Sequence, residues 1–166
     1  MIATGKVVGL FTVDRRAESM KRVEQFSALV GRGIEGDRYL LGTGTYSKKP
    51  EPGRQVTLIQ SEILESLKDK FNITVKPEES RRNVLTEGIE INDLIGSEFF
   101  MGTVRLLAHR LTEPCKHLEN LLEQPGLYKE LWGNGGISCV ILTDGIIKGG
   151  EIITTHLAYK YAPPNL

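Results

Sequence analysis

The stretch Gly135-Gly136-Ile137-Ser138-Cys139-Val140-Ile141-Leu142 decides the fold, because two glycines open a short run of mostly apolar residues. In an extended chain Ile137, Cys139 and Ile141 point to one face of the strand. Val140 lies on the opposite face, so apolar side chains occupy both faces. This pattern is typical of a strand buried on both sides, and it predicts that the stretch lies inside a β structure.

Similar short runs occur along the whole 166-residue chain, and its 18 glycines separate them. Short β-branched runs between glycines predict many short strands joined by tight turns. We expect strands over Lys6–Val13, Val23–Val30, Gln55–Ile59, Asn83–Thr86, Glu98–Met101, Val104–Arg110, Ile137–Leu142 and Glu151–Tyr159. Ser61–Phe71 and Lys116–Glu123 instead space their apolar residues as an amphipathic helix does. The sequence therefore predicts a mainly β fold with a few short flanking helices.

Length and composition predict a single domain over residues 1–166. Hydrophobic residues make up 40% and charged residues 25%, close to the averages of soluble globular proteins. A chain of this length buries enough apolar surface to be stable without disulfides or metals. The proline-containing tail 162–166 is expected to be flexible. Leu41–Gly53, rich in glycine, proline and polar residues, is expected to be a long surface loop.

Charge and cysteine content narrow the partners and the compartment. Lys plus Arg and Asp plus Glu are equal at 21 each, so the chain lacks the basic excess that nucleic-acid polymers attract. The apolar run Val7–Val13 is too short to cross a membrane as a helix, and no signal cleavage site follows it. The two cysteines, Cys115 and Cys139, favour reduced thiols and a cytoplasmic protein. We therefore expect neither nucleic acid nor membrane as a partner.

The segment Gly33-Ile34-Glu35-Gly36-Asp37-Arg38-Tyr39 concentrates glycines and charges after a predicted strand. Its glycine spacing matches neither a Rossmann fingerprint nor a Walker loop. One interpretation is a turn that Asp37 stabilises through Arg38 or the backbone. The other is a loop whose backbone approaches an anionic ligand, with Arg38 supplying fixed charge.

A second group of donors is Arg81-Arg82-Asn83, just before an apolar run. Guanidinium groups present planar pairs of donors that suit phosphate, and Asn83 can add a neutral hydrogen bond. The alternative is an ordinary solvated surface. The anion-binding interpretation requires that Arg81 and Arg82 face the loop that holds Arg38.

Cys115 is the sharpest candidate for chemistry. It follows Pro114 at a predicted helix start, where free backbone N–H groups lower a thiol pKa and favour the thiolate. The alternative is a small buried hydrophobe, a role that suits Cys139 on its apolar strand. His117 lies two residues after Cys115. A structural zinc site needs four ligands, and side chains two residues apart at a helix start diverge, so neither zinc nor a Cys–His dyad is favoured.

Taken in order, these segments resemble the MOSC domain, a family named after the C-terminal part of molybdenum cofactor sulfurases. The matching segments are Gly33–Tyr39, Arg54–Leu58, Arg81–Val84, Gly96 with Phe99 and Gly102, Glu113–Cys115, and Gly135–Ile137 leading to Gly149–Glu151. They extend over about residues 5–157. The resemblance implies a closed antiparallel or mixed β-barrel, similar to the β-barrel of pyruvate kinase, with short helices beside it.

The same resemblance implies a molybdenum cofactor, whose molybdopterin part carries a terminal phosphate. Cys115 would then be the catalytic residue and bind molybdenum as a soft thiolate ligand. The cofactor would be held by Gly33, Gly36, Asp37, Arg38, Arg81, Arg82 and Asn83. No pyridoxal phosphate is expected, because the chain lacks the desulfurase domain that precedes this one in larger members of the family.

The implied function is that of a molybdenum-cofactor-binding protein, a group whose stand-alone members include molybdenum-dependent reductases of N-hydroxylated small molecules. Such an enzyme needs a separate redox protein, since the sequence resembles no flavin, haem or iron–sulfur site. Two other functions remain open. One is a sulfur carrier or cofactor-delivery protein, with a persulfide on Cys115 that a sulfur-donor protein supplies. The other is a non-catalytic interaction domain that has kept only the barrel.

Overall fold

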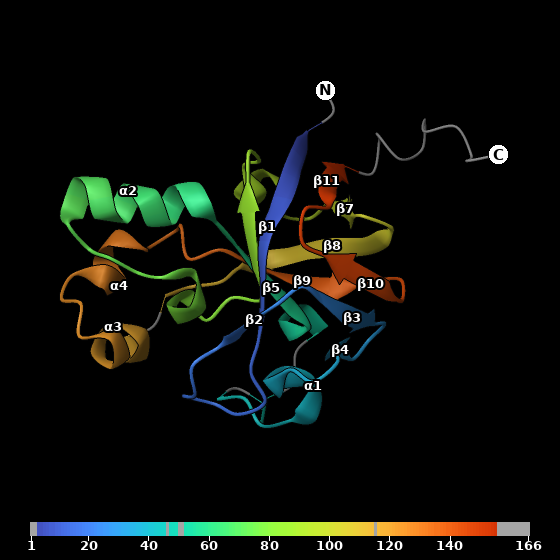
Figure 1. Cartoon of the computed structure of the whole chain (residues 1–166), viewed down its shortest axis with the longest axis horizontal. Helices are drawn as coiled ribbons and strands as arrows, with labels where there is room; N and C mark the ends of the chain where they lie inside the picture. The colour runs from blue at the N-terminus through green and yellow to red at the C-terminus, as the bar shows by residue number, and fades with distance from the viewer. Residues whose placement is uncertain (1–2, 46, 50–51, 115, 156–166) are drawn as a thin grey trace.

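The computed structural model describes residues 3–45, 47–49, 52–114 and 116–155, and Figure 1 labels most of its strands and its α-helices. The strands are β1 (Thr4–Thr12), β2 (Lys21–Val23), β3 (Gln25–Leu29), β4 (Gly33–Ile34), β5 (Val56–Gln60), β6 (Val84–Glu87), β7 (Glu98–Met101), β8 (Val104–Leu111), β9 (Ile137–Ile141), β10 (Gly145–Lys148) and β11 (Ile152–Thr155). The α-helices are α1 (Arg38–Leu41), α2 (Ser61–Phe71), α3 (Lys116–Leu122) and α4 (Leu127–Glu130). The 3-10 helices are η1 (Pro52–Arg54), η2 (Pro77–Ser80) and η3 (Ile91–Leu94). The predicted mainly β fold is confirmed.

Seven strands close a barrel in the order β1, β6, β5, β9, β8, β7 and β11, with β11 pairing back to β1. Neighbours in this ring are antiparallel except β5 and β6, which are parallel, so the barrel is mixed as expected. β2 pairs with β1 outside the ring, and β10, β3 and β4 form a separate small sheet. Closure leaves no open strand edge among the seven.

The barrel interior is an apolar core that alternate residues of its strands fill. Ile137, Cys139 and Ile141 of β9 all lie in this core, as their spacing predicts. Cys139 is fully buried, and burial raises the pKa of its thiol far above the ordinary value. The interpretation of Cys139 as a small buried hydrophobe is confirmed.

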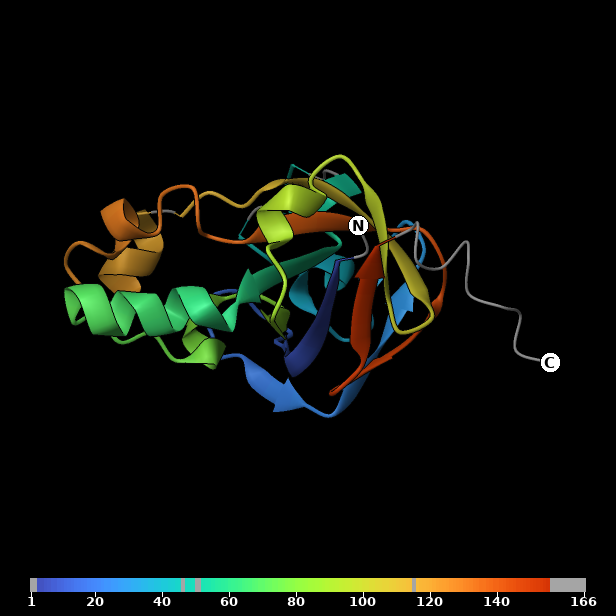
Figure 2. The same cartoon turned by 90° about the horizontal axis from the view of Figure 1, so that it is seen from above.

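A second apolar core lies between the outer face of the barrel and the helices. It joins Ile59 of β5 and Leu85 of β6 to Leu67 of α2, Leu118 of α3 and Leu127 of α4. Viewed from above, α2, α3 and α4 gather on one side of the barrel (Figure 2). This side of the barrel therefore carries a helical layer, while the small sheet lies elsewhere on its surface.

The helix predicted over Ser61–Phe71 is confirmed as α2, and most predicted strands agree within one or two residues. The strand predicted over Val23–Val30 corresponds to β3, but the pattern does not predict the separate strand β2, which ends at Val23. After β2, which pairs with β1, the chain bends at Glu24, and the Glu24 carbonyl accepts a hydrogen bond from the Gly149 amide at 3.0 Å. The following strand β3 pairs with β10 instead. The sequence pattern misses β10, since only its Ile147 is buried.

Parts of two predictions lie outside the described residues, namely the tail 162–166 and the end of the strand expected over Glu151–Tyr159. The described part of that strand is β11. Within the described ranges, no helix is long and apolar enough to cross a membrane.

Candidate functional site

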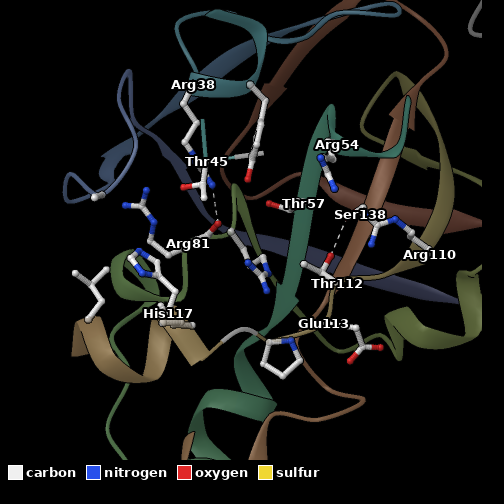
Figure 3. Close-up of a pocket in the computed structure, with 16 residues that line it drawn as sticks. Arg38, Thr45, Arg54, Thr57, Arg81, Arg110, Thr112, Glu113, His117 and Ser138 are labelled. Carbon is white, nitrogen blue, oxygen red and sulfur yellow. Dashed lines mark hydrogen bonds between the residues drawn. The ribbon is translucent and has the colours of Figure 1, made fainter. Parts of the chain in front are cut away.

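A cavity of about 310 Å³ lies on the outer face of the barrel, between α1 and α3 (Figure 3). Five of its described lining residues are arginines, Arg38, Arg54, Arg81, Arg82 and Arg110, and one, Glu113, is a carboxylic acid. The remaining described lining residues are Ala17, Tyr39, Thr45, Thr57, Thr112, Pro114, His117, Leu118, Leu121 and Ser138. This excess of guanidinium groups over carboxylates favours a ligand with negative charge.

Three neighbouring strands supply one polar row of the cavity wall. Thr57 of β5 pairs with Ser138 of β9, and Ser138 pairs with Arg110 of β8. Thr57 and Ser138 alternate with the interior residues of their strands, so they face outward. The ladder between β8 and β9 shifts register between Ala108 and Arg110. This bulge turns Arg110 from the interior face, where strict alternation would place it, to the outer face.

Arg38 is held in place by Asp37, which caps α1. The Asp37 carboxylate is fully buried, accepts hydrogen bonds from the Val13 and Tyr39 amides at 3.2 and 3.4 Å, and pairs with Arg38 Nη1 at 3.4 Å. Burial raises the pKa of Asp37, while the charge of Arg38 opposes that rise. Asp37 thus makes the contacts with Arg38 and the backbone that the turn interpretation expects.

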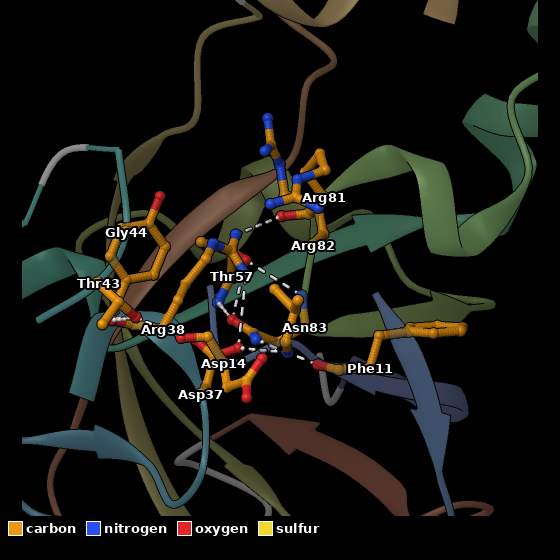
Figure 4. A network of polar contacts seen from close by, with 12 residues as sticks. Phe11, Asp14, Asp37, Arg38, Thr43, Gly44, Thr57, Arg81, Arg82 and Asn83 are labelled. Carbon is orange, nitrogen blue, oxygen red and sulfur yellow. Dashed lines mark hydrogen bonds and ion pairs between the residues drawn. The ribbon is translucent and has the colours of Figure 1, made fainter. Parts of the chain in front are cut away.

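Arg38 also links its loop to the second donor group. Its Nη2 donates to the Arg81 carbonyl at 3.0 Å (Figure 4). The Arg81 guanidinium donates to the Glu18 carbonyl. Burial and the nearby charge of Arg38 lower the pKa of Arg81. Because the two like charges are held together, an anion placed between them would relieve their repulsion.

Arg81 adopts a left-handed backbone conformation with φ of 65°. For a residue with a β-carbon this conformation costs on the order of 1 kcal/mol. It turns the chain between η2 and β6, so that Arg81 and Arg82 both line the cavity. The Arg82 Nε donates to the Gly135 carbonyl at 2.8 Å, which fixes the guanidinium next to the start of β9.

Asn83 lies behind the cavity wall and is fully buried. Its Oδ1 accepts hydrogen bonds from the amide and the hydroxyl of Thr57, both at 3.1 Å. Its Nδ2 donates to the Phe11 carbonyl at 3.2 Å, and its side chain also bonds to Asp37. Asn83 therefore connects three segments of the wall and orders the residues that face the cavity.

The structure brings together the three arginines that the sequence predicted, since Arg38, Arg81 and Arg82 line one cavity. The other predicted contacts, Gly33, Gly36, Asp37 and Asn83, do not belong to its described lining. Gly33 lies in β4 with φ of 132°, and a β-carbon there would meet the Gln55 carbonyl at 3.2 Å. Gly36 lies in the following turn with φ of 79°. The two glycines shape the loop that presents Arg38.

Two arginines that line the cavity, Arg54 and Arg110, were not predicted from the sequence. Arg54 ends η1, and its Nη1 donates to the Lys49 carbonyl at 2.7 Å. Arg110 reaches the cavity only because of the bulge in β8. Arg54 belongs to a segment that resembles the family, so its role could have been predicted from that resemblance. Arg110 could not, because a single sequence does not reveal a register shift.

Cys115, predicted as the catalytic residue and molybdenum ligand, lies outside the described residues. Its described neighbours Glu113, Pro114 and His117 all line the cavity. Among the residues that the structure describes, no three His, Cys, Asp or Glu side chains gather as metal ligands do. What the described site can do is hold an anion through guanidinium groups, with hydroxyl groups as further donors.

Comparison with known proteins places the chain in a family. The family model described as the MOSC domain matches residues 45–154. Comparison with curated proteins gives no match. Among solved structures, the YuaD protein from Bacillus subtilis is similar with a TM-score of 0.78 and 22% identity, over 93% of this chain and 96% of that one.

Two proteins named YiiM are also similar in structure. The protein from Geobacillus stearothermophilus has a TM-score of 0.70 and 14% identity, over 92% of this chain and 75% of that one. The Escherichia coli protein has a TM-score of 0.66 and 16% identity, over 91% and 69%. These likenesses show a shared fold. The match of the family model over residues 45–154 establishes that the chain belongs to the MOSC domain family.

Proposed function

We propose that the chain binds the molybdenum cofactor in the arginine-lined cavity and acts as a reductase of N-hydroxylated small molecules. The observation that carries the proposal is the set of five arginines around one cavity, beside the segment that contains Cys115. The family is associated with this cofactor, and the cavity volume of about 310 Å³ falls in the range of small-molecule sites.

The donors of the cavity fit the chemistry of molybdopterin. A phosphate monoester carries about two negative charges near neutral pH and three acceptor oxygens. Arg81 and Arg82 are adjacent and present guanidinium groups that suit these oxygens. Arg38, which pairs with Asp37, donates to the Arg81 carbonyl and so positions the pair. The Thr112 and Ser138 hydroxyls, which hydrogen-bond to each other at 2.9 Å, leave one O–H donor for the polar edge of a pterin ring.

Each residue then has a separate role. Arg81 and Arg82 bind the phosphate, and Cys115 supplies a soft thiolate to the metal. When bound, the cofactor supplies a centre that passes two electrons to the substrate. The overall reaction converts R–NHOH, two electrons and two protons into R–NH₂ and water. The electrons come from a separate redox protein.

The test is the cofactor content of protein purified from a host that makes molybdopterin. We expect stoichiometric molybdenum, measured by mass spectrometry, and stoichiometric pterin, measured by fluorescence after oxidation. Arg81→Gln combined with Arg82→Gln should lower the pterin content about tenfold or more, as loss of charged hydrogen bonds predicts. The matched control is Arg32→Gln, an exposed arginine outside the cavity lining, which should retain the full content.

Turnover is tested with a chemical electron donor and an N-hydroxylated aromatic amine. Wild-type protein should release the amine, and Cys115→Ser should lose both molybdenum and turnover. Labile sulfur on Cys115 in protein without molybdenum would instead favour the carrier function. Absence of molybdenum, pterin and labile sulfur, in a host whose other molybdenum enzymes are loaded, would contradict both functions.

A further inference from the structure

The loop that joins β1 to β2 forms part of the cavity wall. We call residues 14–19 of this loop the strap, since all six are exposed and none belongs to a helix or strand. Both ends of the strap are fixed, because the flanking Val13 and Met20 are buried in the second apolar core. Ala17, in the middle of the strap, lines the cavity. The strap is therefore an exposed segment between two fixed points, and its centre borders the cavity.

The strap is attached to the chain that follows α1. The Arg16 amide donates to the Thr43 carbonyl at 3.3 Å, and the Thr43 hydroxyl donates to the Asp14 carbonyl. The Thr43 amide in turn donates to the Arg38 carbonyl at 2.9 Å. Figure 1 shows the loop between β1 and β2 next to α1. One side of the strap is thus held by the same element that presents Arg38 to the cavity.

The strap also bonds to Arg81, which ends η2 before the chain enters β6. The Arg81 Nη1 donates to the Glu18 carbonyl. Next to Glu18, Ala17 has φ of 62°, a left-handed conformation that costs free energy in a residue with a β-carbon. Contacts elsewhere in the strap must offset that cost, and the bond to Arg81 is one of them. The observed position of the strap therefore depends in part on where the Arg81 guanidinium lies.

Arg81 can hold the strap and a ligand at the same time. A guanidinium carries five N–H donors in a fixed plane, and an oxyanion binds two that are parallel. The bond to Glu18 uses Nη1, so the edge formed by Nε and Nη2 suits the oxyanion. The nearby Arg38 repels Arg81, and an anion bound between them removes that repulsion. A ligand that holds Arg81 in place therefore also strengthens its bond to the strap.

We propose that the strap is a cover whose closure is linked to anion binding in the cavity. An oxyanion held by Arg81 fastens the strap through the Glu18 carbonyl, and the fastened strap in turn tightens anion binding by the same factor. With Ala17 against the cavity, a fastened strap shields the bound group from water and slows its release. This inference rests on the anion-binding part of the proposed function and requires neither molybdenum nor turnover.

The test measures protease access to the strap in protein without cofactor. Trypsin cleaves after Arg15 and Arg16, which are both exposed, and the fragments are quantified by mass spectrometry. Saturating inorganic phosphate, compared with chloride at equal ionic strength, should slow these cleavages roughly tenfold, the effect that one charged hydrogen bond has on a local opening equilibrium. Arg32 is exposed in the turn between β3 and β4 and does not belong to the described cavity lining. Cleavage after Arg32 is therefore the internal reference and should keep its rate.

Substitutions locate the effect. Arg81→Gln should abolish the protection by phosphate, and Arg81→Lys should restore little of it, because an ammonium group lacks two parallel donors. Arg15→Gln, which removes a charge from the strap itself and leaves Arg16 cleavable, is the matched control and should keep the protection. Thr43→Val removes the hydroxyl bond to the Asp14 carbonyl and leaves every arginine in place. It should speed cleavage of the strap and weaken phosphate binding severalfold in calorimetry, as reciprocal coupling requires.

The results separate the cover from the proposed function. Phosphate that binds in calorimetry but leaves cleavage after Arg15 and Arg16 unchanged overturns the cover and leaves the anion site standing. Faster cleavage with phosphate means that the ligand displaces the Glu18 carbonyl from Arg81, which is the opposite coupling and also overturns the cover. Protection that survives in Arg81→Gln overturns the role of Arg81. Absence of phosphate binding overturns the cover too, while the cofactor content of protein from a competent host still decides the proposed function.

Discussion

Asn83→Ala is expected to destabilise the protein strongly, although Asn83 stands in a segment that resembles a ligand-binding motif. The substitution strands two buried polar groups, the Thr57 amide and the Phe11 carbonyl, whereas the Thr57 hydroxyl keeps its bond from the amide of residue 83. Each unsatisfied buried group costs about 1 kcal/mol or more, so the loss is at least about 2 kcal/mol. A domain of this size has a free energy of unfolding of about 5–15 kcal/mol, so the effect is a large share.

Urea unfolding followed by circular dichroism measures this loss. Asn120→Ala, on an exposed position of α3, is the matched control and should change the free energy of unfolding by no more than about 0.5 kcal/mol. A loss below about 1 kcal/mol in Asn83→Ala, together with weaker phosphate binding, would refute the reasoning. It would mean that Asn83 contacts the ligand and does not hold the wall.

Three further outcomes are expected. Gly136→Ala should lower the free energy of unfolding by at least about 2 kcal/mol, because φ is 99° and a β-carbon would lie 2.0 Å from the Leu58 carbonyl. Gly88→Ala, at φ of 77° with no neighbour within 4 Å, should lower it less. In a chromogenic thiol titration, native protein should show one reactive thiol and Cys115→Ser should show none. The reason is that burial raises the pKa of the Cys139 thiol, and reaction of both cysteines in native protein would contradict this. The folded-state pKa of Asp37 is raised above 3.8, so the folded state keeps that proton longer and stability falls as pH rises through the window between the two values. In urea unfolding, Asp37→Asn should lack this component, and a constant difference from wild type across the window would count against it.

The sequence predicted β8 well because its apolar and polar residues alternate, and it predicted β7 and β9 because short apolar runs are bounded by glycines. It failed where the chain changes sheets. Val23–Val30 is continuously strand-like in composition, yet the turn at Glu24 depends on a bond to Gly149, over a hundred residues later. No local pattern encodes such a contact.

The sequence predicted only part of the candidate site. Arg81 and Arg82 are adjacent donors, and the resemblance to a family motif linked them to Arg38. All three arginines line the cavity. Arg110 could not be assigned, because strict alternation from Leu106 and Ala108 would point it into the barrel, and only the bulge points it out. Asn83 is polar and belongs to a segment that resembles the family. Composition does not reveal that its side chain is buried, where it connects residues of the cavity wall.

The most direct test of the central claim is anomalous X-ray scattering at the molybdenum edge from crystals of protein purified from a cofactor-producing host. We expect a single strong peak per chain, within the cavity and next to Pro114 and His117, with pterin density extending toward Arg81 and Arg82. Absence of any molybdenum peak, or a peak away from this cavity, would contradict it.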